Sequence, residues 1–289
     1  MSVDQKRTQS LFRKLGRLSA KLTSDPQPED VHQFRTTTRR IETLFGELVS
    51  KPGRNERKLL KQLAKIRKRA GRVRDLDVQM AALSTLKIGR DGEDKRALLT
   101  ALAADRARYE KKLVSLVDEE SLQAMRKRIR RAAKDPHLYD SAIEPASKAL
   151  RMFAQLARKQ GEIAEAVLHQ YRLRCKRIRY VAEMAGQEPL AEAVVEQLKA
   201  IQDAAGDWHD WDTLSLRAEG LFSNTPNAPI ITALRGVRHS KLAEALRVTE
   251  AAKANLLEMQ ASAARRKKPA SSEVLRHSNQ ATLTSAASA

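Results

Sequence analysis

Apolar residues recur every three or four positions along most of the chain, which is the spacing of one face of an α-helix. Residues 31–48 show this pattern clearly, with apolar side chains at Val31, Phe34, Ile41, Leu44, Phe45 and Leu48. Helix start and stop signals stand at the two ends of the run, because Pro28-Glu29-Asp30 precedes it and Pro52-Gly53 follows it. The pattern therefore predicts one amphipathic helix across this segment.

Eight further stretches have helical periodicity and are separated by short breaks rich in Gly, Pro, Asp or Asn. We expect helices at about residues 4–23, 56–88, 94–117, 119–134, 142–160, 163–185, 189–220 and 228–260. Strong helix formers fill these stretches, and alternation of Val, Ile and Thr is rare in them. The expected fold class is all-α, with helices joined by short turns into antiparallel bundles.

Two sequence motifs occur twice in the chain and in the same order. Residues 31–44 read VHQFRTTTRRIETL and residues 168–181 read LHQYRLRCKRIRYV. Residues 66–77 read IRKRAGRVRDLD and residues 201–212 read IQDAAGDWHDWD. The two matches have offsets of 137 and 135 residues, so we predict an internal duplication. Two homologous helical halves, about residues 1–138 and 139–261, would face each other across a pseudo-twofold axis. Residues 262–289 are small, polar and basic at their start, and we expect a disordered tail there.

Charge narrows the class of partner. The chain has 55 Lys and Arg against 35 Asp and Glu, a formal net charge of +20, and a polyanion would relieve the resulting self-repulsion. Cys175 is the only cysteine, which excludes an internal disulfide and a multi-cysteine zinc site. No run of about 18 apolar residues occurs, and the amino-terminal residues lack the apolar segment of a secretion signal. These features favour a cytoplasmic protein without a membrane partner.

Basic residues of the repeated helix lie on the face opposite its apolar residues. The first copy contributes His32, Arg35, Arg39 and Arg40, and the second contributes His169, Arg172, Lys176 and Arg177, with Tyr180 one turn further. Such neighbours are about 5–6 Å apart and repel one another unless an anion lies between them. A single basic stripe is usually a solvated face, but its repetition in both halves favours a shared function.

A phosphate polymer suits these residue types. The arginine fork binds two phosphate oxygens at once, and lysine adds a mobile charge. A histidine beside arginines is expected to have a pKa that is lowered in the empty site and raised by a bound phosphate. We therefore expect tighter binding at mildly acidic pH.

The second motif carries aspartates and a glycine in each half. Asp75 and Asp77, like Asp210 and Asp212, are expected to orient arginines or to hold packed helices by ion pairing. The preceding glycines, at positions 71 and 206, are expected to permit a close approach of helices. Histidine and aspartate at 209–210 could ligate a metal, but no metal-binding spacing supports this, and we predict neither a metal nor a cofactor.

Sequence signals of catalysis are absent. The chain has no phosphate-binding glycine loop, no nucleophile elbow and no dinucleotide-binding fingerprint. Cys175 lies on the flank of its predicted helix opposite the basic stripe and is expected to be buried. The sequence therefore predicts a binding protein rather than an enzyme.

The repeated motifs resemble those of the CHAD family, named for a conserved histidine α-helical domain. The resemblance is carried by Val31-His32-x-x-Arg35-x-x-x-Arg39-Arg40 and Arg74-Asp75-Leu76-Asp77, and by Leu168-His169-x-x-Arg172-x-x-x-Lys176-Arg177 and His209-Asp210. It covers about residues 5–255. The resemblance implies two antiparallel bundles about a pseudo-twofold axis and a basic central groove or pore that binds inorganic polyphosphate, without catalytic activity. Arg74 and His209 join the expected binding residues through it.

Alternative functions remain at this point. Counterion release lets any phosphate polymer bind a chain of this charge, so a nucleic-acid-binding protein is the second candidate. Aromatic residues make up only 4% of the chain, which argues against single-strand base stacking. A polyphosphatase would need clustered carboxylates, and the sequence has only separated pairs. A structural protein that coats polyphosphate granules, with the basic start of the tail as an anchor, is a further possibility.

Overall fold

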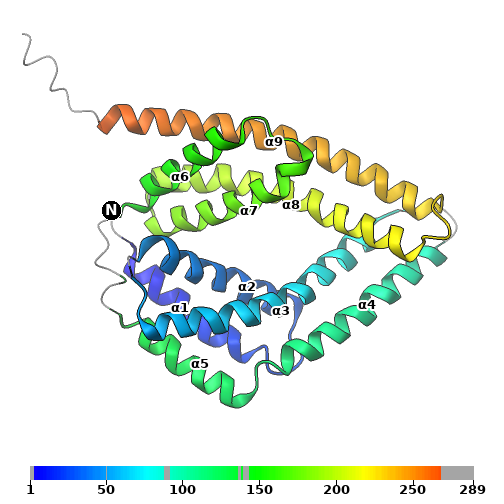
Figure 1. Ribbon diagram of the computed structural model, residues 1–289, viewed down its shortest axis with the longest axis horizontal. Coiled ribbons are helices and arrows are strands. Elements are labelled where there is room, and N and C mark those ends of the chain that lie inside the picture. The colour runs from blue at the N-terminus through cyan, green and yellow to red at the C-terminus, as the bar shows by residue number, and fades with distance from the viewer. Residues whose placement is uncertain (1–2, 50, 88–91, 136–137, 139–142, 268–289) are drawn as a thin grey trace, which may run out of the picture.

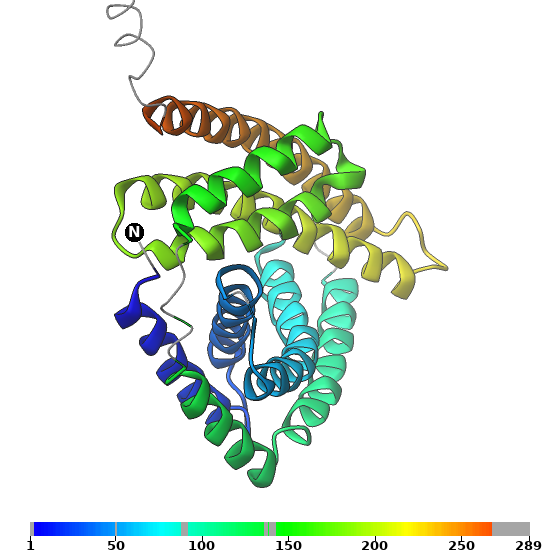
Figure 2. The same ribbon diagram turned by 60° about the vertical axis from the view of Figure 1, so that its left-hand side comes forward.

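The computed structural model describes residues 3–49, 51–87, 92–135, 138 and 143–267, and every regular element in these ranges is helical. The first half of the chain forms α1 (Gln5–Ala20), α2 (Pro28–Thr43), α3 (Arg54–Thr85), α4 (Glu93–Val114) and α5 (Glu119–Ala132). The second half forms α6 (Pro145–Gln160), α7 (Glu165–Ala182), α8 (Pro189–Leu221) and α9 (Pro229–Lys267). The halves are two antiparallel bundles that lie against each other (Figure 1, Figure 2). The predicted all-α fold class is confirmed.

Helix ends follow the signals seen in the sequence. Pro28 is the first helical residue of α2. The acidic residues in the first turn of α2 interact favourably with the positive end of the helix dipole. The side chain of Asp4 accepts a hydrogen bond from the backbone N–H of Arg7 at the start of α1, and Asp118 caps α5 in the same way. A π-helix (Leu44–Leu48) continues α2, and a 3-10 turn (Glu183–Ala185) continues α7.

The carboxyl-terminal helix is longer than predicted. Sequence analysis placed the start of a disordered tail at residue 262, but α9 continues to Lys267. Leu256 is fully buried, and Met259 and Ala263 pack against the core, so an apolar stripe with helical spacing extends past this boundary. Residues 268–289 of the predicted tail lie outside the described residues.

The two halves differ in their last segment. In the second half, α9 runs unbroken above α8, whereas the first half covers the corresponding length with α4, a turn and α5 (Figure 1). Because the chain bends between α4 and α5, α5 lies against α1 and α3. The pseudo-twofold relation between the halves remains a prediction.

Two apolar clusters hold the halves together. The main core contains buried side chains from both bundles, including Phe34 of α2 and Tyr171 of α7. A second cluster joins α3, α4, α8 and α9 at the far end of the molecule, with Leu83 and Trp211 among its buried members. Trp208 is 4% exposed and belongs to the main core. Cys175 is also buried as predicted. Polar side chains lie where α2 faces α7 and where α3 faces α8, and we call this surface the seam. The apolar packing around the seam supports it.

The described helices include none that is long and apolar enough to span a lipid bilayer.

Candidate anion-binding site

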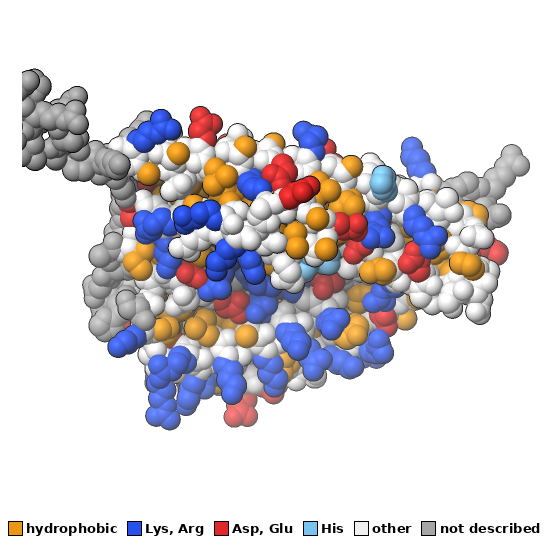
Figure 3. All heavy atoms as spheres, turned by 45° about the horizontal axis from the view of Figure 1, so that its top comes forward, with side chains coloured by type: hydrophobic (Ala, Val, Ile, Leu, Met, Phe, Trp, Pro, Cys, Tyr) orange, Lys and Arg blue, Asp and Glu red, His pale blue; other side chains and the backbone are white. Residues whose placement is uncertain are grey.

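Four cations from the repeated motif meet where α2 faces α7. Arg35 and Arg39 project from α2, and Arg172 and Lys176 from α7, and each of these charges acts on at least one of the others. Burial and neighbouring positive charges lower the pKa of Lys176 to about 7, with Arg172 and Arg39 the strongest of those neighbours. Lys and Arg side chains gather along the recessed seam between the halves, with a few carboxylates among them (Figure 3).

In each half, one arginine of the repeated helix packs against a glycine of the long helix that follows it in the chain. These pairs are Arg35 with Gly71 of α3 and Arg172 with Gly206 of α8. The guanidinium of Arg35 donates a hydrogen bond from Nη1 to the carbonyl oxygen of Arg67 at 3.3 Å, and Arg172 donates from Nε to Gln202 at the same distance. A Cβ atom at Gly71 would collide with the Arg35 guanidinium, and one at Gly206 would lie 2.9 Å from Nη2 of Arg172. The prediction that these glycines let helices approach is thus refined, because each makes room for an arginine side chain.

A carboxylate follows each of these glycines by one helical turn. Asp75 lies 3.9 Å from Nη2 of Arg35, and Asp210 interacts electrostatically with Arg172 and with Asp75. Burial raises the pKa of Asp210 to about 6, and the charges of Asp75 and Asp207 add to this effect. The pKa of Asp75 is also raised by desolvation, although its side chain is 64% exposed. Because Asp75 of α3 acts on both Arg172 and Asp210, the two carboxylates lie near each other where α3 faces α8.

The histidines of the motif occupy the same seam. The rings of His169 and His209 are 4.0 Å apart between centroids. Burial lowers the pKa of His209 to about 4, with His169 and Arg172 contributing. The pKa of His32 is lowered by desolvation and by Arg74. The predicted lowering of histidine pKa values in the empty site agrees with these directions.

Two hollows lie along the seam. One, of about 370 Å³, is between α2 and α7 and is lined by the cations Arg39, Arg174, Lys176 and Arg177, together with Glu42, Thr43, Leu173 and Tyr180. The other, of about 760 Å³, is lined mainly by α3 and α8 and contains three cations, Arg74, Lys87 and Lys241, and two carboxylates, Asp207 and Asp210. The hollow between α2 and α7 therefore has the larger excess of positive charge.

Comparison with known proteins identifies the fold that carries this seam. A family model described as the CHAD domain matches residues 7–219, which include both copies of the two motifs. The chain belongs to the CHAD family. The crystal structure of the CHAD domain from the plant Ricinus communis is similar at a TM-score of 0.62 and 18% sequence identity, covering 84% of this chain and 87% of that one. PptA from Streptomyces chartreusis is similar at 0.58 and 16% identity, covering 90% of this chain and all of PptA. At these identities the likeness shows the fold. No curated protein matches the sequence.

Two predicted binding residues of this CHAD protein are held by carboxylates of the opposite half. Arg40 donates from Nε to Oε2 of Glu183 at 2.6 Å, and Arg177 forms an ion pair with Glu47. Glu183 lies just after α7 and Glu47 in the π-helix just after α2, so the two pairs connect the halves in both directions. The Arg40 charge is neutralised by a buried partner, whereas the Arg177 side chain is 59% exposed and still lines the hollow.

Tyr180 lines the hollow between α2 and α7, but little of its side chain is exposed there. Its side chain is 1% exposed, below the guanidinium groups of Arg40 and Arg179, which lie 5.6 and 5.0 Å from its ring centroid. The ring is buried because α7 turns this position toward the protein interior. The face of the ring therefore lies under the two guanidinium groups.

Sequence reasoning missed two cations of the site. Arg67 of α3 acts on both Arg35 and Arg39 and forms an ion pair with Glu42 at 2.9 Å. It directly follows Ile66, the first matched residue of the second motif, which was the available signal. Arg174 lines the hollow between α2 and α7, but it lies off the stripe drawn on an ideal helix.

The remaining aspartates of the motif act as predicted. Asp77 pairs with Arg106 of α4 at 2.7 Å, and Asp212 pairs with Arg238 of α9 at 2.8 Å. Both pairs connect a long helix to the next helix in its own half. These ion pairs stabilise the packing of the helices beside the seam, and they do not involve Arg35 or Arg172.

Proposed function

We propose that this CHAD protein binds inorganic polyphosphate in the hollow between α2 and α7, without catalysing a reaction on it. The observation that carries the proposal is the lining of this hollow, which combines four cations from both halves with a single carboxylate. Phosphate oxygens would supply the missing negative charge, and each charge-assisted hydrogen bond contributes about 1.5–3 kcal/mol.

A polymer fits the seam better than a single phosphate. The cationic positions continue from the hollow at Arg39 and Lys176, past Arg35 and Arg172, to Arg74 beside the second hollow. On α2 alone, His32 and Arg39 are seven residues apart, or about 10 Å along the helix axis. A chain of phosphates can contact several of these groups at once, whereas one phosphate reaches only its nearest neighbours.

The predicted binding residues then divide into two groups. We assign direct contact with phosphate to the groups that face the seam, namely His32, Arg35, Arg39, Arg74, His169, Arg172, Lys176, Arg177 and His209. Arg40 and Tyr180 are assigned a supporting role, because the first is neutralised by Glu183 and the second is buried.

The proposal of binding without catalysis takes account of Cys175, the only cysteine of the chain, which lies in the core and outside the seam. Burial raises the pKa of the Cys175 thiol, which keeps it protonated and non-nucleophilic. In the part of the chain that the structure describes, no three His, Cys, Asp or Glu side chains are grouped to hold a metal ion. We propose a cytoplasmic protein that is recruited to polyphosphate granules through this seam.

A competition assay tests the proposed ligand class. Labelled long-chain polyphosphate is bound to the protein at about 0.15 M salt and is challenged with duplex DNA, RNA and heparin at equal phosphate or sulfate concentration. We expect polyphosphate to bind at least about tenfold more tightly than any competitor, because its charged phosphates follow one another directly, without the sugars or bases that separate the charges of the competitors. Equal displacement by RNA or DNA would instead favour the nucleic-acid-binding alternative.

Affinity for polyphosphate is expected to rise about tenfold between pH 8 and pH 5.5. Over this range Lys176, with a pKa of about 7, gains its charge, and Asp210, with a pKa of about 6, loses its own. Both changes make the seam more positive, whereas the lowered pKa of His209, about 4, keeps that residue neutral. The measurement is the Kd by fluorescence anisotropy at constant ionic strength.

The variant Lys176→Arg provides the control for this pH dependence. Arginine remains charged throughout, so the variant should lose the part of the rise that falls above about pH 6.5. An affinity that does not change with pH in the wild-type protein would mean that neither Lys176 nor Asp210 contacts or faces the bound polymer.

A further inference from the structure

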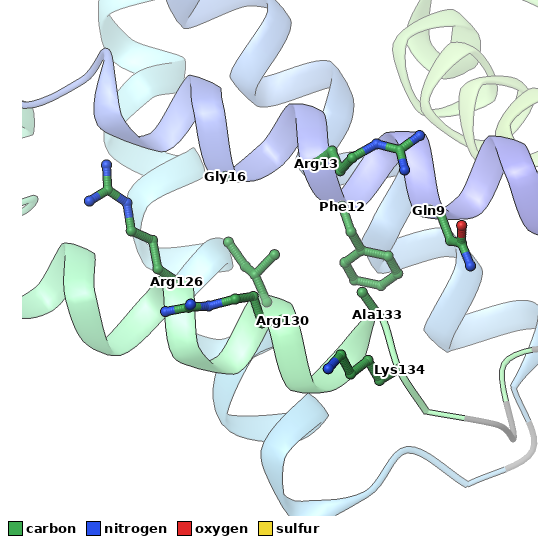
Figure 4. Close-up of a pocket in the computed structure, with 9 residues that line it drawn as sticks. Gln9, Phe12, Arg13, Gly16, Arg126, Arg130, Ala133 and Lys134 are labelled. Atoms are coloured by element: carbon green, nitrogen blue, oxygen red, sulfur yellow. The ribbon is translucent and has the colours of Figure 1, made fainter.

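A second basic feature lies outside the seam, in a groove between α1 and α5. Its volume is about 640 Å³, and the residues that line it all come from α1, α5 and the turn after α5. Figure 4 shows the ring of Phe12 between the two helices, with Arg126 and Arg130 on α5 and Arg13 on α1 around it. No part of this groove belongs to the repeated motifs, so the proposed polyphosphate site does not account for it.

The accessible floor of the groove is apolar and is formed by Gly16 and Ala133. Phe12 and Ile129, which are 1% and 5% exposed, lie beneath it as part of the core. Gly16 lies in the interior of α1, where glycine is about 1 kcal/mol less favourable than alanine. A Cβ atom at Gly16 would meet no other atom within 4 Å, so packing inside the protein does not require the glycine. Its missing side chain leaves the space above the floor free.

The rim of the groove is cationic. Arg126 and Arg130 are one turn apart on α5, Lys134 follows after the helix end, and Arg13 projects from α1. Among the described residues, none of these four exposed side chains has a carboxylate within ion-pair distance, and the groove lining includes no Asp or Glu. The row from Arg126 to Lys134 extends over about 12 Å, or two turns of a helix.

We propose that this groove docks an acidic amphipathic helix of a partner protein. An inorganic phosphate chain has no apolar groups and gains nothing from the floor, so the occupant must combine apolar side chains with negative charge. A helix presents both, because apolar residues three or four apart can enter the groove while Glu or Asp residues one turn apart meet the row of cations. The row of cations spans about two such turns.

The test uses a defined peptide rather than an unknown partner. The probe is a fluorescent helical peptide of about 18 residues with Leu at three- and four-residue spacing and Glu on both flanks, and its control is a scrambled peptide of the same composition. Binding is measured by anisotropy at about 0.15 M salt to the full chain and to Gly16→Leu, which fills the groove. Gly236→Leu is the matched control, since Gly236 is also an interior helical glycine with nothing within 4 Å of an added Cβ.

We expect the patterned peptide to bind at least about tenfold more tightly than the scrambled one, and Gly16→Leu to remove this preference while Gly236→Leu keeps it. Gly16→Leu should be at least as thermally stable as the wild type, because leucine is the better helix former, and should retain polyphosphate binding. Equal binding of the scrambled peptide, or full binding by Gly16→Leu, would overturn the proposal. Neither result depends on whether the seam binds polyphosphate.

Discussion

A chain carrying Arg39→Met and Lys176→Met is expected to bind long-chain polyphosphate about 100-fold more weakly than the wild type, or weaker still. The two side chains line the hollow from opposite helices, and two lost charge-assisted contacts correspond to about 3–6 kcal/mol. Methionine keeps the apolar stem of each side chain, so the packing around Tyr180 is retained. The measurement is the Kd at several salt concentrations, where the slope of log K against log salt should also fall.

The double variant should fold at least as stably as the wild type at pH 7. Because the pKa of Lys176 is lowered in the folded state, its charged form opposes folding, and this cost is fully present below about pH 7 and fades as the pH rises toward the unfolded value. Removing that charge therefore does not weaken the fold, and a lower melting temperature would show that Arg39 or Lys176 has a structural partner.

A matched control separates the site from bulk charge. The pair Arg126→Met and Arg130→Met on α5 removes the same two positive charges from exposed positions outside the seam. This pair should weaken polyphosphate binding by no more than a few-fold, through the overall field alone. If both double variants lose affinity equally, the protein binds polyanions by net charge and the proposed seam has no special role.

Glu183→Ala is expected to destabilise the fold by about 3–5 kcal/mol, which lowers the melting temperature of a chain of this size by about 10 °C. Glu183 is 5% exposed and accepts from Arg40 at 2.6 Å and from Arg179 at 2.9 Å. Removal of the carboxylate takes the counter-charge away from Arg179, which is only 8% exposed, and from the Arg40 side chain, which is 24% exposed. The measurement is thermal and urea unfolding at pH 7.

The comparison for this prediction is Glu42→Ala. Its ion pair with Arg67 is also formed by a carboxylate and an arginine, but both side chains are more than 20% exposed, so the loss should stay below about 1 kcal/mol. Similar unfolding of the two variants would mean that the contact between Arg40 and Glu183 does not connect the halves as the structure indicates.

The sequence predicted the helices well, and it indicated which cations share a helix face, because both follow from local periodicity. The same helical spacing that buries Phe34 and Tyr171 turns Arg35, Arg39, Arg172 and Lys176 to the other side of their helices. The repeat added the information that two such faces exist. The repeat contains no information about which residues of other helices contact each cation.

The predicted end of the last helix was too early because local periodicity was weak there. Alanine carries little apolar signal, so the stripe that continues through Ala263 was not recognised, although this side chain packs against the core. The burial of Tyr180 could not be predicted, because an ideal helical wheel assigns a residue to a face of its helix but does not show which elements cover that face.

What the sequence alone determined is the all-α class, the repeated basic face and the burial of Cys175, since each depends on residues within a few turns of one helix. Only the tertiary structure decided that Arg40 is neutralised by Glu183 whereas Lys176 is left among cations. The partners in such contacts are separated by more than one hundred positions in the chain, and local periodicity contains no information about which of them meet.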